Sequence, residues 1–211
     1  MNFPAMERWR QLPRDTDRED YFRVLSDAVR EYYLAEPSNP FQQSGRSSGE
    51  ARWKETRRPM LEAVHHSGHF MDVGCANGLW LESLVGWARE RGVSIRPHGI
   101  DVVPELVDLA RARFPTDRQS FEVANAFYWQ PKRPYDFVRT NLEYVPHPDW
   151  VAFIQHQYSA VAVGGRLILC HYRNLDEPSI DPGLVAQSAG FTVSGRVEIP
   201  GTAIAWVERT P

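Results

Sequence analysis

The sequence predicts an α/β fold in which a mostly parallel sheet is covered by helices and finished by an antiparallel hairpin. From residue 69 to about residue 190, short apolar runs alternate with segments of helical spacing, an order that is typical of parallel sheets. Two final strand-like runs are separated only by Pro200-Gly201, which indicates a hairpin. The first 60 residues show helical periodicity instead and predict an N-terminal helical cap.

The cap region divides at a segment without periodicity. Residues 20–35 repeat apolar and aromatic side chains at helical spacing, so we expect a helix there. Residues 37–49 are rich in Ser, Gly, Pro and Gln, which predicts a mobile loop. Residues 49–66 are expected to be helical, with a break or kink at Pro59 because proline lacks the backbone N–H of a helix interior.

The alternating part predicts its elements in chain order. The expected strands cover residues 69–73, 95–100, 120–124, 135–140 and 166–171. The expected helices cover residues 79–90, 104–113, 150–163 and 181–189, the third ended by Gly164-Gly165. Residues 191–199 and 202–208 then form the hairpin strands.

Length and charge limit the class of protein. The 211 residues suit one compact domain with a short extension, since domains usually contain about 100–200 residues. A formal charge of −3 gives no general attraction to nucleic acid or to an anionic membrane. No apolar stretch approaches the ~20 residues of a membrane span, and the N-terminus lacks the apolar core of a secretory signal. We therefore expect a soluble, cytoplasmic protein with no membrane partner.

The segment that carries chemical information is residues 70–78, Phe-Met-Asp-Val-Gly-Cys-Ala-Asn-Gly. A strand enters a turn of small residues and a helix follows, so free backbone N–H groups of the helix start face a ligand. A dinucleotide fingerprint, Gly-x-Gly-x-x-Gly, requires glycine where Ala76 and Leu79 stand. No Gly-Lys-Ser/Thr ending of a P-loop is present either.

The turn resembles motif I of the class I S-adenosylmethionine (SAM)-dependent methyltransferases, acidic-x-Gly-x-Gly-x-Gly. Asp72, Gly74 and Gly78 match this motif, and Ala76 replaces its middle glycine. Residues 99–102, 122–126, 135–145 and 164–169 are similar to further family motifs in the same order. The resemblance implies a seven-stranded, Rossmann-like methyltransferase sheet, with residues 1–60 as a helical cap or lid and residues 61–211 as the SAM-binding domain.

The resemblance also implies SAM as the cofactor. It assigns Asp101 to the ribose hydroxyls and Asn125 to the adenine amine, with Ala126 and Phe127 beside the ring. Asp101 as a helix cap and Asn125 as a turn residue remain the structural alternatives. The implied cofactor-binding residues are Asp72, Gly74, Cys75, Ala76, Asn77, Gly78, Asp101, Val102, Asn125, Ala126, Phe127, Asn141 and Leu142.

Catalytic residues are not identified by these motifs. The sulfonium of SAM is already activated, so the protein mainly positions and desolvates the two reactants. A general base, if one is used, is expected after the fourth and fifth strands, where the candidates are Glu143, Tyr144, His147 and His171. For the histidines a structural role is the alternative. Neither the histidines nor the cysteines have metal-ligand spacing, so no metal is expected.

The expected methyl acceptor is a small molecule. The Asn/Asp-Pro-Pro-aromatic motif of base-methylating relatives is replaced here by Asn141-Leu142-Glu143-Tyr144. Trp53, Arg57 and Arg58 are expected to border the cofactor carboxylate or an anionic substrate if the cap acts as a lid. The alternatives are an RNA methyltransferase with a basic groove of Arg111, Arg113, Arg118 and Arg133, and a non-catalytic interaction module. The acceptor atom and the oligomeric state are left open.

Overall fold

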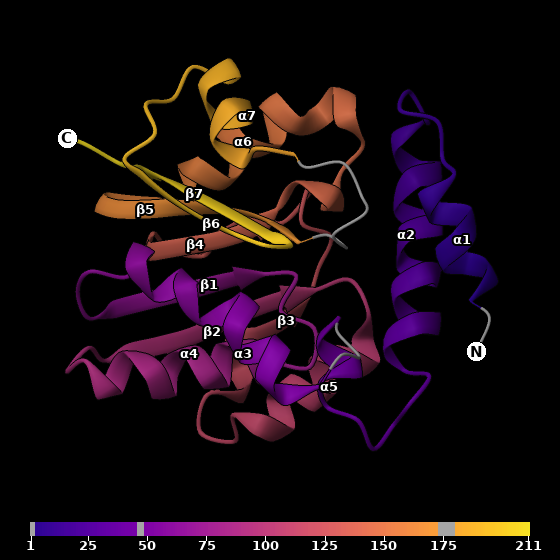
Figure 1. The fold of residues 1–211 in the computed structure, drawn as a ribbon, viewed down its shortest axis with the longest axis horizontal. Helices are drawn as coiled ribbons and strands as arrows, with labels where there is room; N and C mark the ends of the chain where they lie inside the picture. The colour runs from indigo at the N-terminus through magenta and orange to yellow at the C-terminus, as the bar shows by residue number, and fades with distance from the viewer. Residues whose placement is uncertain (1–2, 46–48, 173–179) are drawn as a thin grey trace.

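The fold is a seven-stranded mixed sheet, seen in a computed structural model that describes residues 3–45, 49–172 and 180–211. The strand order is β3-β2-β1-β4-β5-β7-β6 (Figure 1). β1 to β5 pair in parallel, whereas β7 pairs antiparallel with both β5 and β6. The strands are β1 (Gly68–Val73), β2 (Ile95–Asp101), β3 (Phe121–Val123), β4 (Tyr135–Asn141), β5 (Val161–Tyr172), β6 (Gly195–Ile199) and β7 (Thr202–Glu208). The predicted fold class is confirmed.

Helices cover both faces of the sheet (Figure 1). On one face, α4 (Leu79–Glu90) and α5 (Pro104–Arg113) pack over a core that also takes in Trp53 of α3 (Glu50–Arg57). On the other face, α6 (Trp150–Ser159) and α7 (Pro182–Ser188) cover a second core. β1 supplies both cores because successive side chains point to opposite faces, as Phe70 and Met71 do. No helix within the described ranges is long and apolar enough to cross a membrane.

A pair of N-terminal helices stands across the ends of the strands, at the right of Figure 1. They are α1 (Pro4–Arg10) and α2 (Arg18–Tyr33), and α2 is capped by the side chain of Asp17. Arg18 of α2 forms a bidentate ion pair with Asp149, in which its Nε and Nη2 donate to the two carboxylate oxygens at 2.7 and 2.6 Å. The Tyr21 hydroxyl donates to the Glu143 backbone oxygen at 2.7 Å. We call α1 and α2 the cap, because α3 packs on the sheet. The domain boundary between residues 60 and 61 stays a prediction.

The segment expected to be a mobile loop contains a short 3₁₀ turn over the part that the structure describes. Gln42 and Gln43 belong to a 3₁₀ turn, η1 (Gln42–Ser44), and both are buried. Their side-chain amides donate to the backbone oxygens of Tyr32 and Pro37 at 2.8 and 2.9 Å. Polar side chains that satisfy backbone groups therefore hold a segment that has no apolar periodicity. Residues 46–48 lie outside the described residues.

The expected break at Pro59 is confirmed. α3 ends at Arg57, and a 3₁₀ segment, η2 (Arg58–Ala63), follows with proline in its first turn. Three more 3₁₀ turns were not predicted: η3 (Arg118–Ser120), η4 (Leu142–Tyr144) and η5 (His147–Asp149). The short helix α1 was missed as well, because seven residues give too little periodicity.

One helix boundary was wrong. The helix expected over residues 150–163 ends at Ser159, and β5 starts at Val161. Val161 pairs with Tyr135, whose backbone N–H donates to the Ala160 oxygen at 2.8 Å. The β-branched residues at 161 and 163 favour a strand, so the glycines at 164–165 lie within β5. The first hairpin strand likewise starts later than expected, at Gly195.

Two histidines on adjacent strands of the sheet form a hydrogen bond. His69 Nδ1 lies 2.8 Å from His98 Nε2, and burial together with the charge of His69 lowers the pKa of His98 from 6.5 to about 4. Between about pH 6.5 and 4, His98 is therefore protonated in the unfolded chain but neutral in the folded chain. This contribution to stability is present above about pH 6.5 and is lost as the pH falls towards about 4.

We therefore expect His98→Gln to flatten the decline in unfolding free energy between pH 6.5 and 4, measured by urea denaturation at a series of pH values. Arg133, Asp117 and Glu122 also act on His98, so the comparison is made at constant ionic strength. Equal slopes in the variant and the parent protein would contradict this assignment.

Candidate active site

A cavity of about 920 Å³ lies between the carboxyl ends of the parallel strands and the α1–α2 cap. Open α/β sheets place ligands at this edge. The lining from the sheet comes from the turns after β1, β2, β3 and β4, and includes Gly74, Asp101, Asn125 and Asn141. The lining from the cap includes Trp9 and aromatic side chains of α2. The cavity thus joins segments that are far apart in the sequence.

The turn after β1 is held by β2. Gly74 has φ +82° and Ala76 has φ +47°, both in the left-handed region. Asp101 Oδ2 accepts a 2.9 Å hydrogen bond from the Ala76 backbone N–H, and Oδ1 accepts one of 3.0 Å from Val103. Burial raises the pKa of Asp101. Its carboxylate therefore ties the two turns together and still borders the cavity, and each oxygen keeps a further acceptor site.

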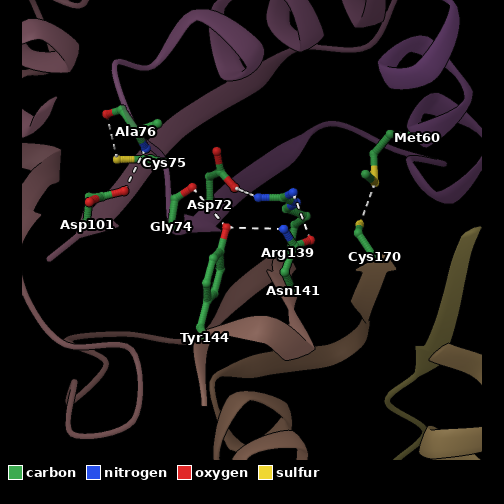
Figure 2. A network of polar contacts seen from close by, with 10 residues as sticks. All are labelled: Met60, Asp72, Gly74, Cys75, Ala76, Asp101, Arg139, Asn141, Tyr144 and Cys170. Carbon is green, nitrogen blue, oxygen red and sulfur yellow. Dashed lines mark hydrogen bonds and ion pairs between the residues drawn. The ribbon is translucent and has the colours of Figure 1, made fainter. Parts of the chain in front are cut away.

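A buried ion pair lies beneath this turn (Figure 2). The β1–β4 register places Asp72 opposite Arg139, and Arg139 Nη1 donates to Asp72 Oδ1 at 3.0 Å. Arg139 Nη2 donates to Asn141 Oδ1, also at 3.0 Å. Burial raises the pKa of Asp72 to about 6, although Arg139 opposes this shift. Both charged side chains line the cavity.

Tyr144 reaches from the turn after β4 to the turn after β1 (Figure 2). Its hydroxyl donates to the Gly74 oxygen at 3.4 Å and accepts from Asn141 Nδ2 at the same distance. A Cβ atom placed on Gly74 would lie 2.3 Å from the Tyr144 Cζ and hydroxyl oxygen. The residue at position 74 must therefore be glycine, for both its φ angle and its close contact with this ring.

The turn after β3 carries the residues expected near adenine. Asn125 and Ala126 line the cavity. Asn125 Oδ1 accepts a 2.8 Å hydrogen bond from the Phe127 backbone N–H, so the turn role left open for Asn125 is present. The Phe127 side chain contacts the cap: its ring lies 4.1 Å from the Arg18 guanidinium carbon and 6.1 Å from the Phe22 ring.

Some implied cofactor residues do not line the cavity. Asn77 is buried, and its amide nitrogen donates to Pro40 O at 2.9 Å. Gly78 packs against Ala110 of α5, 3.1 Å from the Cβ position that it lacks, so it permits helix packing. Leu142 is buried in the core. The implied residues that do line the cavity are Asp72, Gly74, Cys75, Ala76, Asp101, Val102, Asn125, Ala126 and Asn141.

Three of the catalytic candidates, Glu143, Tyr144 and His147, line the cavity. The fourth, His171 of β5, is only 4% exposed and lies behind Glu143, with its Nδ1 3.6 Å from Glu143 Oε1. The structure therefore brings Glu143 and His171 together as a pair. Within the described ranges, no group of three or more His, Cys, Asp or Glu side chains is arranged to hold a metal ion.

The cationic side chains of the cavity were only partly predicted. Arg57 lines it, as expected, whereas Arg58 is exposed and pairs with Glu90 at 2.9 Å. Trp53 is 1% exposed and packs in the core. Arg139 was missed, and its signal is a charged residue that directly follows the apolar pair Phe137-Val138 within a predicted strand.

A family comparison agrees with this architecture. The family described as a methyltransferase domain matches residues 20–192. The chain belongs to the class I SAM-dependent methyltransferases. The resemblance that rested on the turn at residues 72–78 is thereby confirmed, together with the sheet that it implied.

Several curated relatives of this methyltransferase are trans-aconitate 2-methyltransferases. The Rhodopseudomonas palustris (strain BisB5) protein is 32% identical over 108 residues, which are 51% of the chain and 40% of that protein. The Enterobacter sp. (strain 638) protein is 28% identical over 153 residues, which are 70% of the chain and 58% of that protein. The match therefore spans less than two thirds of either relative.

Solved structures share the fold of this methyltransferase. The Burkholderia thailandensis 1,6-didemethyltoxoflavin-N1-methyltransferase, with 1,6-didemethyltoxoflavin and S-adenosylhomocysteine (SAH) bound, aligns with a TM-score of 0.69 at 13% identity. That alignment covers 95% of this chain and 93% of the other. NodS from Bradyrhizobium japonicum WM9, in complex with SAH, aligns with a TM-score of 0.60 at 16% identity over 99% of this chain and 98% of the other. At these identities the likeness concerns the fold.

Proposed function

We propose that this methyltransferase binds SAM in the cavity and transfers its methyl group to a small-molecule acceptor. The observation that carries this proposal is the Gly74 turn, fixed at the cavity wall by the Asp101 carboxylate. The bare glycine lets a ligand approach the backbone closely, and the carboxylate offers acceptor sites for two hydroxyl groups. When bound, SAM supplies a methyl group on a positively charged sulfur, which needs no further activation.

The residues around Asp101 suit the adenosine half of the cofactor. Asp101 would bind the ribose hydroxyls, next to Val102. Asn125 and Ala126 would border the adenine, and Phe127 would shape that end of the cavity through its contact with Phe22. These roles are supported by the order of the motifs and by the common lining of one cavity.

The cap side of the cavity suits a small acceptor. Trp9, Leu12, Tyr21 and Trp150 line this side, so an acceptor would contact aromatic and apolar surface. Arg10 and Arg14 line the cavity from the cap as well. The acceptor must share about 920 Å³ with the cofactor beneath the cap. The curated relatives named for trans-aconitate and the toxoflavin-related enzyme also act on small molecules, which supports this class of acceptor.

Glu143 is the proposed acceptor of a proton. Its carboxylate lines the cavity, His171 lies 3.6 Å behind it, and Tyr21 fixes its backbone oxygen. An acceptor with an N–H or O–H group would lose its proton to Glu143 as the new bond to the methyl carbon forms. A carboxylate acceptor is already ionised near pH 7 and would need no base.

Titration calorimetry with SAM and SAH tests the proposal. We expect Asp101→Ala to weaken SAH binding by about 1.5–3 kcal/mol, the scale of hydrogen bonds to a charged group. Asp108→Ala, which removes an exposed carboxylate of α5 that pairs with Arg111, is the control and should bind normally. Unchanged affinity in Asp101→Ala would remove Asp101 from the site. Absence of any binding of SAM or SAH to the parent protein at millimolar concentration would overturn the proposed function.

The described surface offers no particular support for the RNA alternative. Arg111 and Arg113, two members of the expected basic groove, pair with Asp108 and Glu82 at 3.0 and 2.6 Å. Their guanidinium groups also donate to backbone oxygens of Phe121 and Asn77. Arginines engaged in this way support the packing of α5 and offer little charge to a phosphate backbone.

A further inference from the structure

We propose that one lobe of the cavity is a binding site for a carboxylate group and that Arg57 is the residue that pairs with it. The lobe is defined by Arg57, Asp72, Trp80, Arg139 and Tyr172, all of which line the cavity. The inference deepens the proposed function, because it names the chemistry of a ligand group that this part of the cavity would bind.

Arg57 is the central observation. Its side chain comes from the last residue of α3 and is only 6% exposed. The guanidinium carbon lies over the Tyr172 ring, 3.6 Å from its centre, so the charged group contacts an aromatic face. Its Nη1 atom is buried and has no hydrogen-bond partner among the residues that the structure describes. A buried cation without an anionic partner is costly, and such groups are normally paired.

The neighbours of Arg57 do not balance its charge. Asp72 is the one carboxylate of the lobe, and it already pairs with Arg139 at 3.0 Å. Burial raises the pKa of Tyr172 to about 12, so its hydroxyl is neutral. Asp101 and Glu143 line the same cavity, but Asp101 accepts backbone hydrogen bonds and Glu143 pairs with His171. Counted over the residues that the structure describes, the lobe therefore keeps an excess of one positive charge.

The other unsatisfied groups of the lobe can also donate. The indole N–H of Trp80, the Nε–H of Arg139 and the Tyr172 hydroxyl are buried and have no hydrogen-bond partner among the described residues. The guanidinium carbon of Arg139 lies 5.1 Å from the centre of the Trp80 ring and 5.6 Å from the centre of the Tyr172 ring. The three side chains are therefore neighbours. A ligand group with acceptors only and one negative charge complements this set. A carboxylate fits best, because its planar oxygens match the edge of a guanidinium.

Two molecules could bring the carboxylate. The methionine half of SAM carries one, and this source rests on the proposed function. A carboxylic acid acceptor carries another. Binding measurements separate these sources, because 5′-methylthioadenosine retains the adenosine and the thioether of SAH but lacks its amino acid carboxylate.

Calorimetry with SAH and 5′-methylthioadenosine is performed on the parent protein, Arg57→Gln and Arg58→Gln. If the cofactor brings the carboxylate, Arg57→Gln weakens SAH binding at least tenfold and leaves 5′-methylthioadenosine binding unchanged. Arg58→Gln is the matched control, because it removes an exposed neighbouring arginine, and it should bind both ligands as the parent protein does. Arg57→Lys keeps the positive charge but lacks the planar guanidinium that can form two parallel hydrogen bonds to a carboxylate. This variant should therefore bind SAH with intermediate affinity.

The acceptor arm uses trans-aconitate as a probe and the thermal unfolding midpoint as the readout, with and without SAH. If an acid acceptor brings the carboxylate, trans-aconitate raises the midpoint of the parent protein and of Arg58→Gln but not that of Arg57→Gln. The trans-aconitate measurement gives a result even if neither SAH nor 5′-methylthioadenosine binds. Failure of the proposed function can therefore be distinguished from failure of the carboxylate site. Equal behaviour of Arg57→Gln and the parent protein in both arms would overturn the inference.

Folding of the variant is itself informative. Removal of an unpaired buried cation should leave the unfolding midpoint of the ligand-free protein unchanged or raise it. If Arg57→Gln and Arg57→Lys both fail to fold, Arg57 serves the packing of α3, and the carboxylate site is rejected.

Discussion

Replacement of Arg139 by methionine is expected to lower the unfolding free energy by about 3–5 kcal/mol near pH 7.5, the usual cost of breaking a buried ion pair. Arg139 and Asp72 are 6% and 1% exposed, and their contact is direct at 3.0 Å. Methionine fills much of the arginine volume, so the loss measures mainly the carboxylate left without its cation. Urea denaturation followed by circular dichroism gives the free energy.

The pH dependence of this loss identifies its cause. The pKa of Asp72 is about 6 in the intact pair, and removal of Arg139 raises it further. Below that pKa the carboxyl is neutral when folded, so the variant should recover stability as the pH falls towards 5. The double variant Asp72→Asn/Arg139→Met should likewise recover most of the loss at pH 7.5. A loss below about 1 kcal/mol in Arg139→Met would show that the pair contributes as little as an exposed one.

Replacement of Gly74 by alanine is expected to weaken SAH binding by more than 100-fold and to destabilise the fold by about 1–2 kcal/mol, the cost of a left-handed conformation for a residue with a Cβ. Gly74 has φ +82°. The new methyl group would also overlap the Tyr144 ring, with a closest approach of 2.3 Å. The ring must then move or the turn must deform, and either change alters the wall at which the cofactor is proposed to bind.

Two variants separate these causes. Gly86→Ala in α4 adds the same methyl group where nothing lies within 4 Å, and it should stabilise the protein by about 0.5–1 kcal/mol through helix propensity. Gly74→Ala/Tyr144→Leu removes the overlap but keeps the strained φ angle, so recovered binding would assign the loss to the ring. Calorimetry with SAH reports affinity, and thermal unfolding reports stability. Normal SAH affinity in Gly74→Ala would exclude close ligand approach at this turn.

The features that the sequence predicted well are those encoded within short segments. The strands at residues 69–73 and 135–140 are built around the apolar pairs Phe70-Met71 and Phe137-Val138. α4 begins and ends at its predicted residues because its apolar stripe is continuous. The turn around Gly74 and the position of Asp101 follow from local spacing. The end of α6 was misplaced because the Val161–Tyr135 pairing, a long-range contact, overrides a local helical pattern.

The features that sequence analysis missed depend on register and on the path of the cap. Asp72 faces Arg139 only because β1 and β4 are adjacent with that register. Arg57 becomes a buried cation only because α3 carries it onto the Tyr172 ring at the end of β5. The lining from Trp9 and Tyr21 depends on α1 and α2 crossing the strand ends, which Arg18 and Tyr21 secure through contacts more than 100 residues away. No local pattern contains this information.

The position of β7 between β5 and β6 also bears on how the chain is made. During synthesis the edge of β5 has no neighbour until residues 202–208 have left the ribosome, although β1 to β4 are complete long before. That open edge carries Leu167 and Leu169, which are fully buried in the finished protein. An unpaired apolar strand edge is prone to pair with other chains, so the nascent protein is vulnerable to aggregation at this edge until β7 has been added.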